Sequence, residues 1–207
     1  KKDVVTLITD MNQPLGYAVG NALEIRETIA ALEGRVPADL KELVLGLASW
    51  MMVFGGVAKT PEEGYKIAED NLMGGKGLEK FKQMVAQQGG DPEVVDDPDI
   101  LPTAQHTEDV VATDDGYVTA VNALEIGLCS VALGAGRESV DSKIDMAVGF
   151  LINKKIGDPV KKGESLITIQ YNDRKKMDAI TQRLAKAFTI GAQPVSKPPM
   201  IYKVIKP

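Results

Sequence analysis

The turn over residues 10–16 is the part of this chain that best suits a binding site, because its polar side chains and backbone groups are closely spaced. It follows residues 4–8, a β-branched run that predicts a short buried strand. It precedes residues 18–32, whose apolar spacing predicts a helix. Backbone groups at the start of a helix are unpaired, and α/β proteins use such strand–turn–helix junctions to bind ligands. This junction is therefore the first candidate site.

His106 and Cys129 are the one histidine and the one cysteine, and neither predicts a catalytic centre. Histidine suits proton transfer near neutral pH. His106, however, stands in a polar segment without a triad or a cluster of metal ligands, so we expect it at the surface or between domains. Cys129 lies in the apolar stretch 126–131 and cannot form an internal disulfide. That setting predicts a buried structural thiol.

Two further segments could be taken for ligand sites. Residues 133–137 carry a Gly-x-Gly spacing, but no strand-to-helix transition accompanies it, so the signal for phosphate binding is weak. We expect tight backbone packing there, with Arg137 pairing Asp141 or Asp145. Trp50 and the methionine and phenylalanine residues that follow it predict an apolar helix face. No residue of the chain is predicted to be catalytic or to bind substrate.

The first half of the chain predicts one strand and several helices. After residues 18–32, helices are expected from Pro37 through Met51, from Thr60, and over residues 78–87. Thr60 can cap its helix, since proline follows it and Glu63 stands three residues on. Residues 91–102 are rich in Asp and Pro and predict a connecting loop.

The second half predicts short strands between Gly and Asp turns. They are expected at residues 110–112, 116–121, 144–148 and 165–169, with a hairpin-like segment at 121–126. Residues 174–188 predict one late helix with Met177, Ile180 and Leu184 on its apolar face. We therefore place a domain boundary near Pro102.

Composition excludes some classes of function. The chain has 207 residues, 44% hydrophobic and 26% charged, which is ordinary for a globular protein. Its net charge of -5 gives no electrostatic reason to expect nucleic-acid binding. We find neither a signal peptide nor a long apolar span in the sequence, so no membrane association is expected and the location is predicted to be cytoplasmic.

Several motifs, taken in order, resemble the pyrimidine-nucleoside and thymidine phosphorylases. The first is Thr9-Asp-Met-Asn-Gln-Pro-Leu-Gly16, followed by Ala18-Val-Gly-Asn-Ala-Leu-Glu24. The others lie at residues 39–45, 86–91, 115–118, 133–137, 145–149, 156–166 and 198–202. The phosphate-binding loop and the base-reading residues of that family would lie upstream. The chain thus looks like the C-terminal half of such an enzyme.

The resemblance implies a fold class and a domain division. Residues 1–101 would be the C-terminal part of an α/β domain of the nucleoside phosphorylase and phosphoribosyltransferase type. Residues 102–207 would be an α+β C-terminal domain, mostly antiparallel and related to hammerhead and barrel-sandwich folds. The full-length enzyme would use phosphate and a pyrimidine nucleoside, and is expected to be a homodimer. The chain by itself is expected to be inactive.

The same resemblance implies a potassium ion beside the phosphate loop. The ligands that match in this chain are the main-chain carbonyls of Leu15 and Ala18 and the carboxylate of Glu27. Hard cations take oxygen ligands, and carbonyls three residues apart in an irregular turn can converge on one ion. Without the resemblance, Glu27 would be interpreted as a solvated glutamate near the positive end of its helix.

Two alternatives remain at this point. A phosphoribosyltransferase such as the anthranilate enzyme would share the first half but lack the domain that begins near Val110. A non-catalytic interaction or carrier-like module is the second, because residues 157–166 have the turn pattern of biotinyl and lipoyl carriers. Such carriers need an exposed lysine at a hairpin tip, and the segment 121–126 has none.

Overall fold

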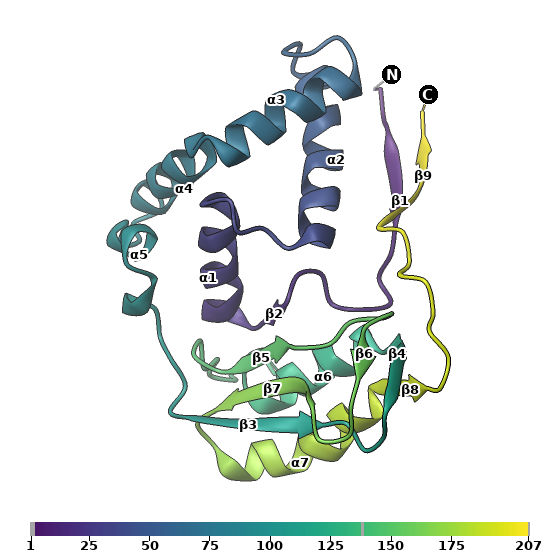
Figure 1. The fold of residues 1–207 in the computed structure, drawn as a ribbon. Coiled ribbons are helices and arrows are strands. Elements are labelled where there is room, and N and C mark those ends of the chain that lie inside the picture. The colour runs from purple at the N-terminus through teal and green to yellow at the C-terminus, as the bar shows by residue number, and fades with distance from the viewer. Residues whose placement is uncertain (1–2, 138, 207) are drawn as a thin grey trace. The chain divides into compact units, whose positions relative to one another are not determined.

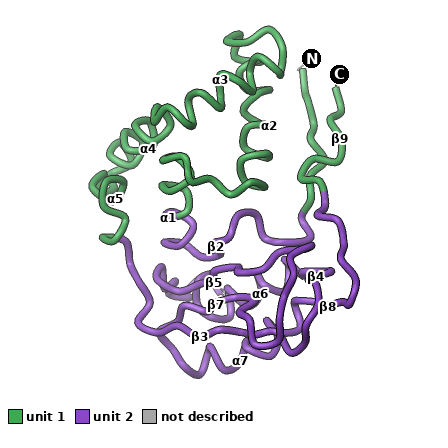
Figure 2. Tube along the Cα trace, viewed as in Figure 1, with its two compact units in different colours: residues 1–10, 27–100, 199–207 green, residues 11–26, 101–198 purple. Residues whose placement is uncertain are grey.

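The computed structural model describes residues 3–137 and 139–206, which divide into two compact units (Figure 2). Unit 1 comprises residues 1–10, 27–100 and 199–207, and unit 2 comprises residues 11–26 and 101–198. The change at residues 100/101 lies beside the boundary that we expect near Pro102. In addition, residues 11–26 join unit 2 and residues 199–207 join unit 1. The family domains 1–101 and 102–207 stay a prediction.

Unit 1 is mainly helical, as its apolar spacing predicts (Figure 1). Its helices are α2 (Ala38–Phe54), α3 (Pro61–Met73), α4 (Lys76–Gln87), α5 (Glu93–Asp96) and the 3-10 helix η1 (Pro98–Ile100). Helix α1 (Asn21–Leu32) begins in unit 2 and continues into unit 1. The expectation of a plain loop over residues 91–102 is wrong. Residues 93–96 form the short helix α5, and the Asp91 carboxylate accepts the Glu93 N–H at 2.9 Å in the turn just before it.

The Thr60 cap is confirmed. Thr60 Oγ1 accepts the N–H of Glu63 at 3.2 Å, and Pro61 is the first residue of α3. The Glu63 carboxylate reaches back to the N–H of Lys59 at 2.8 Å. Two otherwise unpaired donors at this helix start are therefore satisfied.

Unit 1 also holds a pair of strands from opposite ends of the chain. Strand β1 (Thr6–Thr9) pairs antiparallel with β9 (Ile201–Ile205). The Tyr202 hydroxyl donates to the buried Asp10 carboxylate at 3.2 Å, and the Asp10 N–H donates to the Met200 carbonyl at 3.0 Å. The early strand is thus found about where we expect it, but the expectation that it is buried is wrong, since its residues alternate between exposed and half-buried. Its partner strand is not apparent from the sequence.

Unit 2 contains two antiparallel sheets. The first has the order β2-β5-β7-β3, and the second has the order β6-β4-β8. Their strands are β2 (Ala18–Val19), β3 (His106–Val111), β4 (Gly116–Val121), β5 (Gly149–Ile152), β6 (Pro159–Val160), β7 (Ser165–Tyr171) and β8 (Phe188–Gly191). The prediction of helices with mostly antiparallel strands is confirmed. The finer kinship with hammerhead and barrel-sandwich folds stays a prediction.

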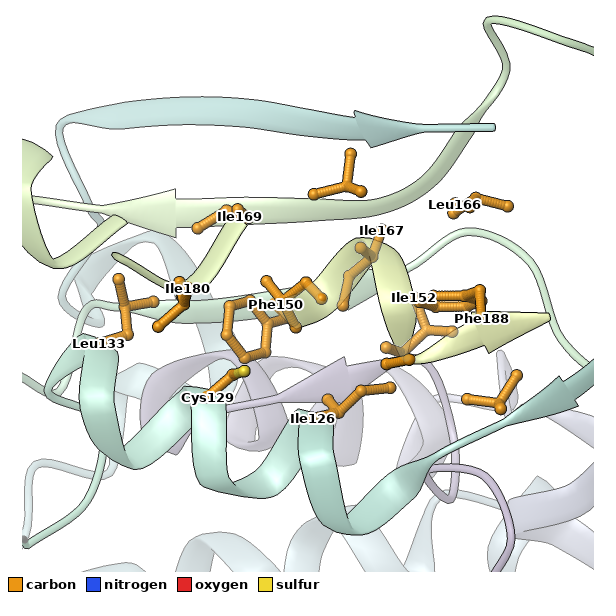
Figure 3. Packing of buried hydrophobic residues seen from close by; sticks show 14 of the residues in the cluster. Ile126, Cys129, Leu133, Phe150, Ile152, Leu166, Ile167, Ile169, Ile180 and Phe188 are labelled. Atoms are coloured by element: carbon orange, nitrogen blue, oxygen red, sulfur yellow. The ribbon is translucent and has the colours of Figure 1, made fainter. Parts of the chain in front are cut away.

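Helices α6 (Ala123–Leu133) and α7 (Arg174–Lys186) contribute to one apolar core with these sheets. Figure 3 shows Ile126, Cys129 and Leu133 of α6 pointing into the cluster that contains Phe150. The predicted apolar face of α7 is confirmed, since Met177, Ile180 and Leu184 are all buried.

Two predictions for unit 2 are wrong. Residues 121–126 do not form a hairpin, because Asn122 caps α6 by accepting the Glu125 N–H at 3.0 Å. Residues 144–148 do not form a strand, because the Asp145 carboxylate accepts the Ala147 N–H at 3.0 Å and bends the chain. Strand β5 begins directly after this turn, at Gly149.

Candidate functional site

Two of the predicted ion ligands are Leu15, in the turn between β1 and β2, and Ala18, the first residue of β2. The expectation that the helix begins at residue 18 is wrong, because α1 begins at Asn21. Gly16 lies between them with φ +66°, a left-handed conformation that glycine adopts without a steric cost. Leu15 is 37% exposed, whereas Ala18 is buried. Both residues belong to unit 2.

Other atoms of this turn are held by the rest of unit 2. The Asn12 carbonyl accepts the Ala123 N–H at 3.2 Å, and the Gln13 side-chain oxygen accepts the Ile156 N–H at 3.0 Å. Further along, the carbonyl of Pro14 accepts from Lys155 Nζ at 3.2 Å, and the carbonyl of Tyr17 accepts the Ile152 N–H at 2.7 Å. The turn is therefore anchored at both of its ends.

The strand register fixes the direction of the Ala18 carbonyl. Ala18 lies opposite Leu151 in the antiparallel pair of β2 and β5, and the neighbouring pair is joined by the Ile152–Tyr17 hydrogen bond. Because hydrogen-bonded and non-hydrogen-bonded pairs alternate in such a ladder, the backbone groups of Ala18 face away from β5. Strand β2 is the edge strand of its sheet, so this carbonyl points outward from the sheet.

Close backbone approach holds β2 against β5. A Cβ atom on Gly149 would stand 2.2 Å from the Val19 carbonyl oxygen, and one on Gly20 would stand 2.7 Å from the Val148 carbonyl oxygen. Both distances are far below van der Waals contact. Glycine at these two positions is what allows the edge strand, and with it the turn, to take this place.

Glu27, the third predicted ligand, lies in α1 and is half-buried. The start of α1 is satisfied by Glu24, which accepts the Gly20 N–H at 3.0 Å, so capping does not require Glu27. Glu27 is assigned to unit 1 and the two carbonyls to unit 2. Two carbonyls and a carboxylate fit a hard cation in their chemistry, and the set of three stays a prediction. Across residues 3–137 and 139–206, no group of three or more His, Cys, Asp or Glu side chains could hold a metal ion.

His106 and Cys129 lie on the surface of a sheet and in the apolar core, respectively. His106 is exposed on β3, with its ring centroid 5.4 Å from that of Tyr171. Cys129 is fully buried, and this burial raises the pKa of its thiol. The predictions of a surface histidine and a structural thiol agree with these positions.

The Gly-x-Gly segment ends a helix. Gly134, with φ +115°, caps α6, and a Cβ on Gly136 would stand 2.8 Å from the Val131 side chain. Tight packing is therefore the correct interpretation. The Asp145 carboxylate, a predicted partner of Arg137, accepts from Asn172 Nδ2 at 2.7 Å as well as from the Ala147 N–H.

Unit 1 has a groove that the sequence does not predict. Its volume is about 520 Å³, and residues of β1, α2, α3 and β9 line it. Trp50, which we assigned only to an apolar helix face, forms part of the lining, and Lys206 Nζ lies 5.3 Å from its ring centroid. The pairing of the first and last strands creates this groove, and no local sequence pattern indicates it.

Part of the antiparallel unit resembles a known class of domain. Residues 117–191 match the family model described as the pyrimidine nucleoside phosphorylase C-terminal domain. A phosphoribosyltransferase without such a domain is therefore disfavoured.

Similarity to curated proteins extends along nearly the whole chain. It is 45% identical over 204 residues to the pyrimidine-nucleoside phosphorylase of Geobacillus stearothermophilus, covering 99% of this chain and 47% of that protein. The corresponding proteins of Staphylococcus haemolyticus (strain JCSC1435) and Staphylococcus aureus (strain USA300) are 45% and 46% identical, with the same coverage. The chain is thus a relative of the pyrimidine-nucleoside phosphorylases and spans about half of their length, the half that carries the C-terminal domain.

Among the described residues, no helix is both long enough and apolar enough to cross a bilayer.

Proposed function

We propose that the full-length protein is a pyrimidine-nucleoside phosphorylase. In this reaction phosphate attacks C1 of the sugar of uridine, thymidine or deoxyuridine, the bond to the base breaks, and a pentose 1-phosphate and a free pyrimidine form. The observation that carries the proposal is the 45% identity over 99% of the chain to proteins of that name. The match of residues 117–191 to the C-terminal domain of the family supports it independently.

This chain contributes scaffold to the enzyme and no catalytic residue. The resemblance assigns the phosphate loop and the base-reading residues to the segment upstream. Catalysis of this kind depends on positive groups that orient phosphate and on stabilisation of the negative charge that grows on the departing base. Unit 2 would hold the backbone turn near those groups. The C-terminal domain of the enzyme would help to close the substrate cleft.

A potassium ion is the proposed cofactor, with the Leu15 and Ala18 carbonyls and the Glu27 carboxylate as ligands from this chain. The outward direction of the Ala18 carbonyl and the glycine turn between the two carbonyl residues support this assignment. When bound, the ion supplies positive charge beside the phosphate loop. The remaining ligands come from the upstream half.

Exposed apolar residues support the proposal that this chain is part of a larger folded assembly. On unit 1 they include Val4 and Ile8 near or in β1, and Met51 and Phe54 of α2, which are 71% and 53% exposed. Large apolar side chains with this much exposure are common on surfaces that contact another polypeptide. The upstream half and a second subunit of a cytoplasmic homodimer are the proposed partners.

The ion assignment is tested with the full-length Glu27→Gln variant, which keeps the size of the side chain and removes its charge. We expect lower phosphorolysis and a steeper dependence on potassium concentration than in the parent. Parent-like activity throughout a potassium titration would return Glu27 to the role of a solvated helix residue. Because it concerns the ion alone, that result would leave the proposed reaction standing.

A further inference from the structure

A buried lysine contacts the turn that carries the proposed ion ligands. Lys155 is only 7% exposed, and it is the one lysine among the buried residues of the part of the chain that the structure describes. Burial of an ammonium group is costly unless hydrogen bonds or other polar contacts compensate for it. Lys155 therefore needs a structural or functional reason to lie inside unit 2.

The contacts of the ammonium group indicate that reason. Lys155 Nζ donates to the Pro14 carbonyl at 3.2 Å and lies 4.8 Å from the centroid of the Tyr17 ring. Pro14 directly precedes Leu15, and Tyr17 directly precedes Ala18. One ammonium group thus contacts the residue before each of the two proposed carbonyl ligands.

The backbone around Lys155 is itself held in place. Its N–H donates to Asp158 Oδ2 at 2.9 Å, and the next N–H, of Ile156, donates to the Gln13 side chain at 3.0 Å. The ammonium group consequently projects from a fixed turn, and all of these residues belong to unit 2. Between its two contacts lies Gly16, the residue at which the turn could most easily change conformation.

We propose that Lys155 is a positioning residue for the potassium site, a role that rests on the proposed function. It holds Pro14 and Tyr17 so that the Leu15 and Ala18 carbonyls keep the directions that a cation requires. Partners of this outer-shell kind typically contribute roughly 10- to 100-fold to metal affinity. Lys155 is not itself a ligand, because an ammonium group has no lone pair to offer.

The direction in which potassium affinity changes when the ammonium group is removed distinguishes a positioning role from a purely electrostatic one. If the ammonium charge acted only through space, it would repel the bound cation, and its removal would strengthen potassium binding. If it holds the carbonyls, its removal weakens binding. Lys155→Met, which keeps the length of the side chain but removes its charge and donors, distinguishes the two.

The experiment uses the full-length protein and measures thermal stabilisation by KCl, with tetramethylammonium chloride keeping the ionic strength constant. A ligand that binds the folded state stabilises it by RT ln(1 + [L]/Kd), so fitting the melting temperature against potassium concentration gives Kd, the half-saturating potassium concentration of the site. This readout does not depend on catalysis. We expect the half-saturating potassium concentration to rise by roughly tenfold or more in Lys155→Met. Lys155→Arg, which keeps the charge and donors, should recover part of the loss.

Lys154→Met is the matched control. Lys154 is the neighbouring lysine, but it pairs with Glu164 at 2.9 Å and donates to the Pro159 carbonyl, away from the turn. The half-saturating potassium concentration of the Lys154→Met variant should equal that of the parent. If Lys155→Met does not fold, Tyr17→Leu carries the test, because loss of the aromatic face should raise that concentration roughly two- to fivefold.

An unchanged or lower half-saturating concentration in Lys155→Met, or an unchanged one in Tyr17→Leu, would overturn the positioning role. A parent protein without any potassium response would overturn it together with the ion site. Phosphorolysis by that parent would still leave the proposed enzyme standing, so the two failures can be told apart.

Discussion

Asp158 and Lys155 are joined by two hydrogen bonds across one turn. The Lys155 N–H donates to Asp158 Oδ2 at 2.9 Å, and the Asp158 N–H donates to the Lys155 carbonyl at 3.0 Å. The second carboxylate oxygen of Asp158 accepts from Lys197 Nζ, also at 2.9 Å. Asp158 thereby closes the turn from which the buried Lys155 reaches the proposed ion site.

The charge of Asp158 should make part of the stability depend on pH. Burial alone would raise the pKa of Asp158, but the hydrogen bonds from Lys197 and the Lys155 N–H and the nearby positive charges outweigh burial and hold that pKa below its ordinary value. A carboxyl group whose pKa falls on folding stabilises the protein above its unfolded pKa, near 4, and loses this contribution as the pH falls through the folded pKa.

Asp158→Asn keeps the shape of the side chain and removes this charge. We expect the variant to be less stable at pH 7 by about 1–2 kcal/mol, and the difference to shrink below about pH 4. Urea unfolding of parent and variant from pH 7 to pH 3 measures it. A difference that stays constant across this range would contradict the assignment.

Gly149→Ala should displace the edge strand β2 from β5. The added methyl group would stand 2.2 Å from the Val19 carbonyl oxygen, a backbone atom that cannot move independently. We expect a loss of about 1–3 kcal/mol in unfolding free energy, together with weaker potassium stabilisation. Gly127→Ala is the control, since nothing lies within 4 Å of its added Cβ and it stands inside α6. That change should stabilise the protein by about 0.5–1 kcal/mol.

Cys129 should be unreactive while the protein is folded. Its thiol is fully buried, and its raised pKa leaves little thiolate at neutral pH. An aromatic disulfide reagent that releases a coloured thiolate should therefore react with Cys129 only after denaturation. Cys129→Ser should lower the free energy of unfolding by about 1–3 kcal/mol. Rapid reaction of the native thiol would show that the core around α6 opens readily.

Removal of the Thr60 cap should weaken α3. Thr60→Ala leaves the Glu63 N–H without its side-chain acceptor, and we expect a loss of about 1 kcal/mol. Thr60→Ser retains the hydroxyl and should remain near the parent. Equal unfolding free energies for the alanine and serine variants would mean that the cap contributes nothing.

Local patterns predicted the elements that are stabilised locally. The start of α3 follows from Thr60, Pro61 and Glu63, and the apolar face of α7 follows from the spacing of its buried residues. Helix α6 was missed because it is apolar on nearly every side: Ile126 and Cys129 are buried, whereas Leu124 and Leu128 are exposed. Without a polar face, it has no helical period to detect.

The contacts that build the candidate site are mostly long-range. Lys155 and Pro14 are 141 residues apart, and Tyr202 and Asp10 are 192 apart. Nothing in the local composition near either residue indicates its partner. Carbonyl ligands cannot be recognised from residue types either, because every residue has a main-chain carbonyl. Only the resemblance to a family pointed to Leu15 and Ala18.

The most direct test of the central claim is phosphate-dependent release of base by the full-length protein. Purified protein is incubated with uridine or thymidine, with and without phosphate, and free pyrimidine and pentose 1-phosphate are quantified. We predict equal amounts of the two products, formed only when phosphate is present, and none above a blank from the 207-residue chain alone. A folded full-length protein that releases no base from either nucleoside, or equal turnover by the isolated chain, would contradict the account.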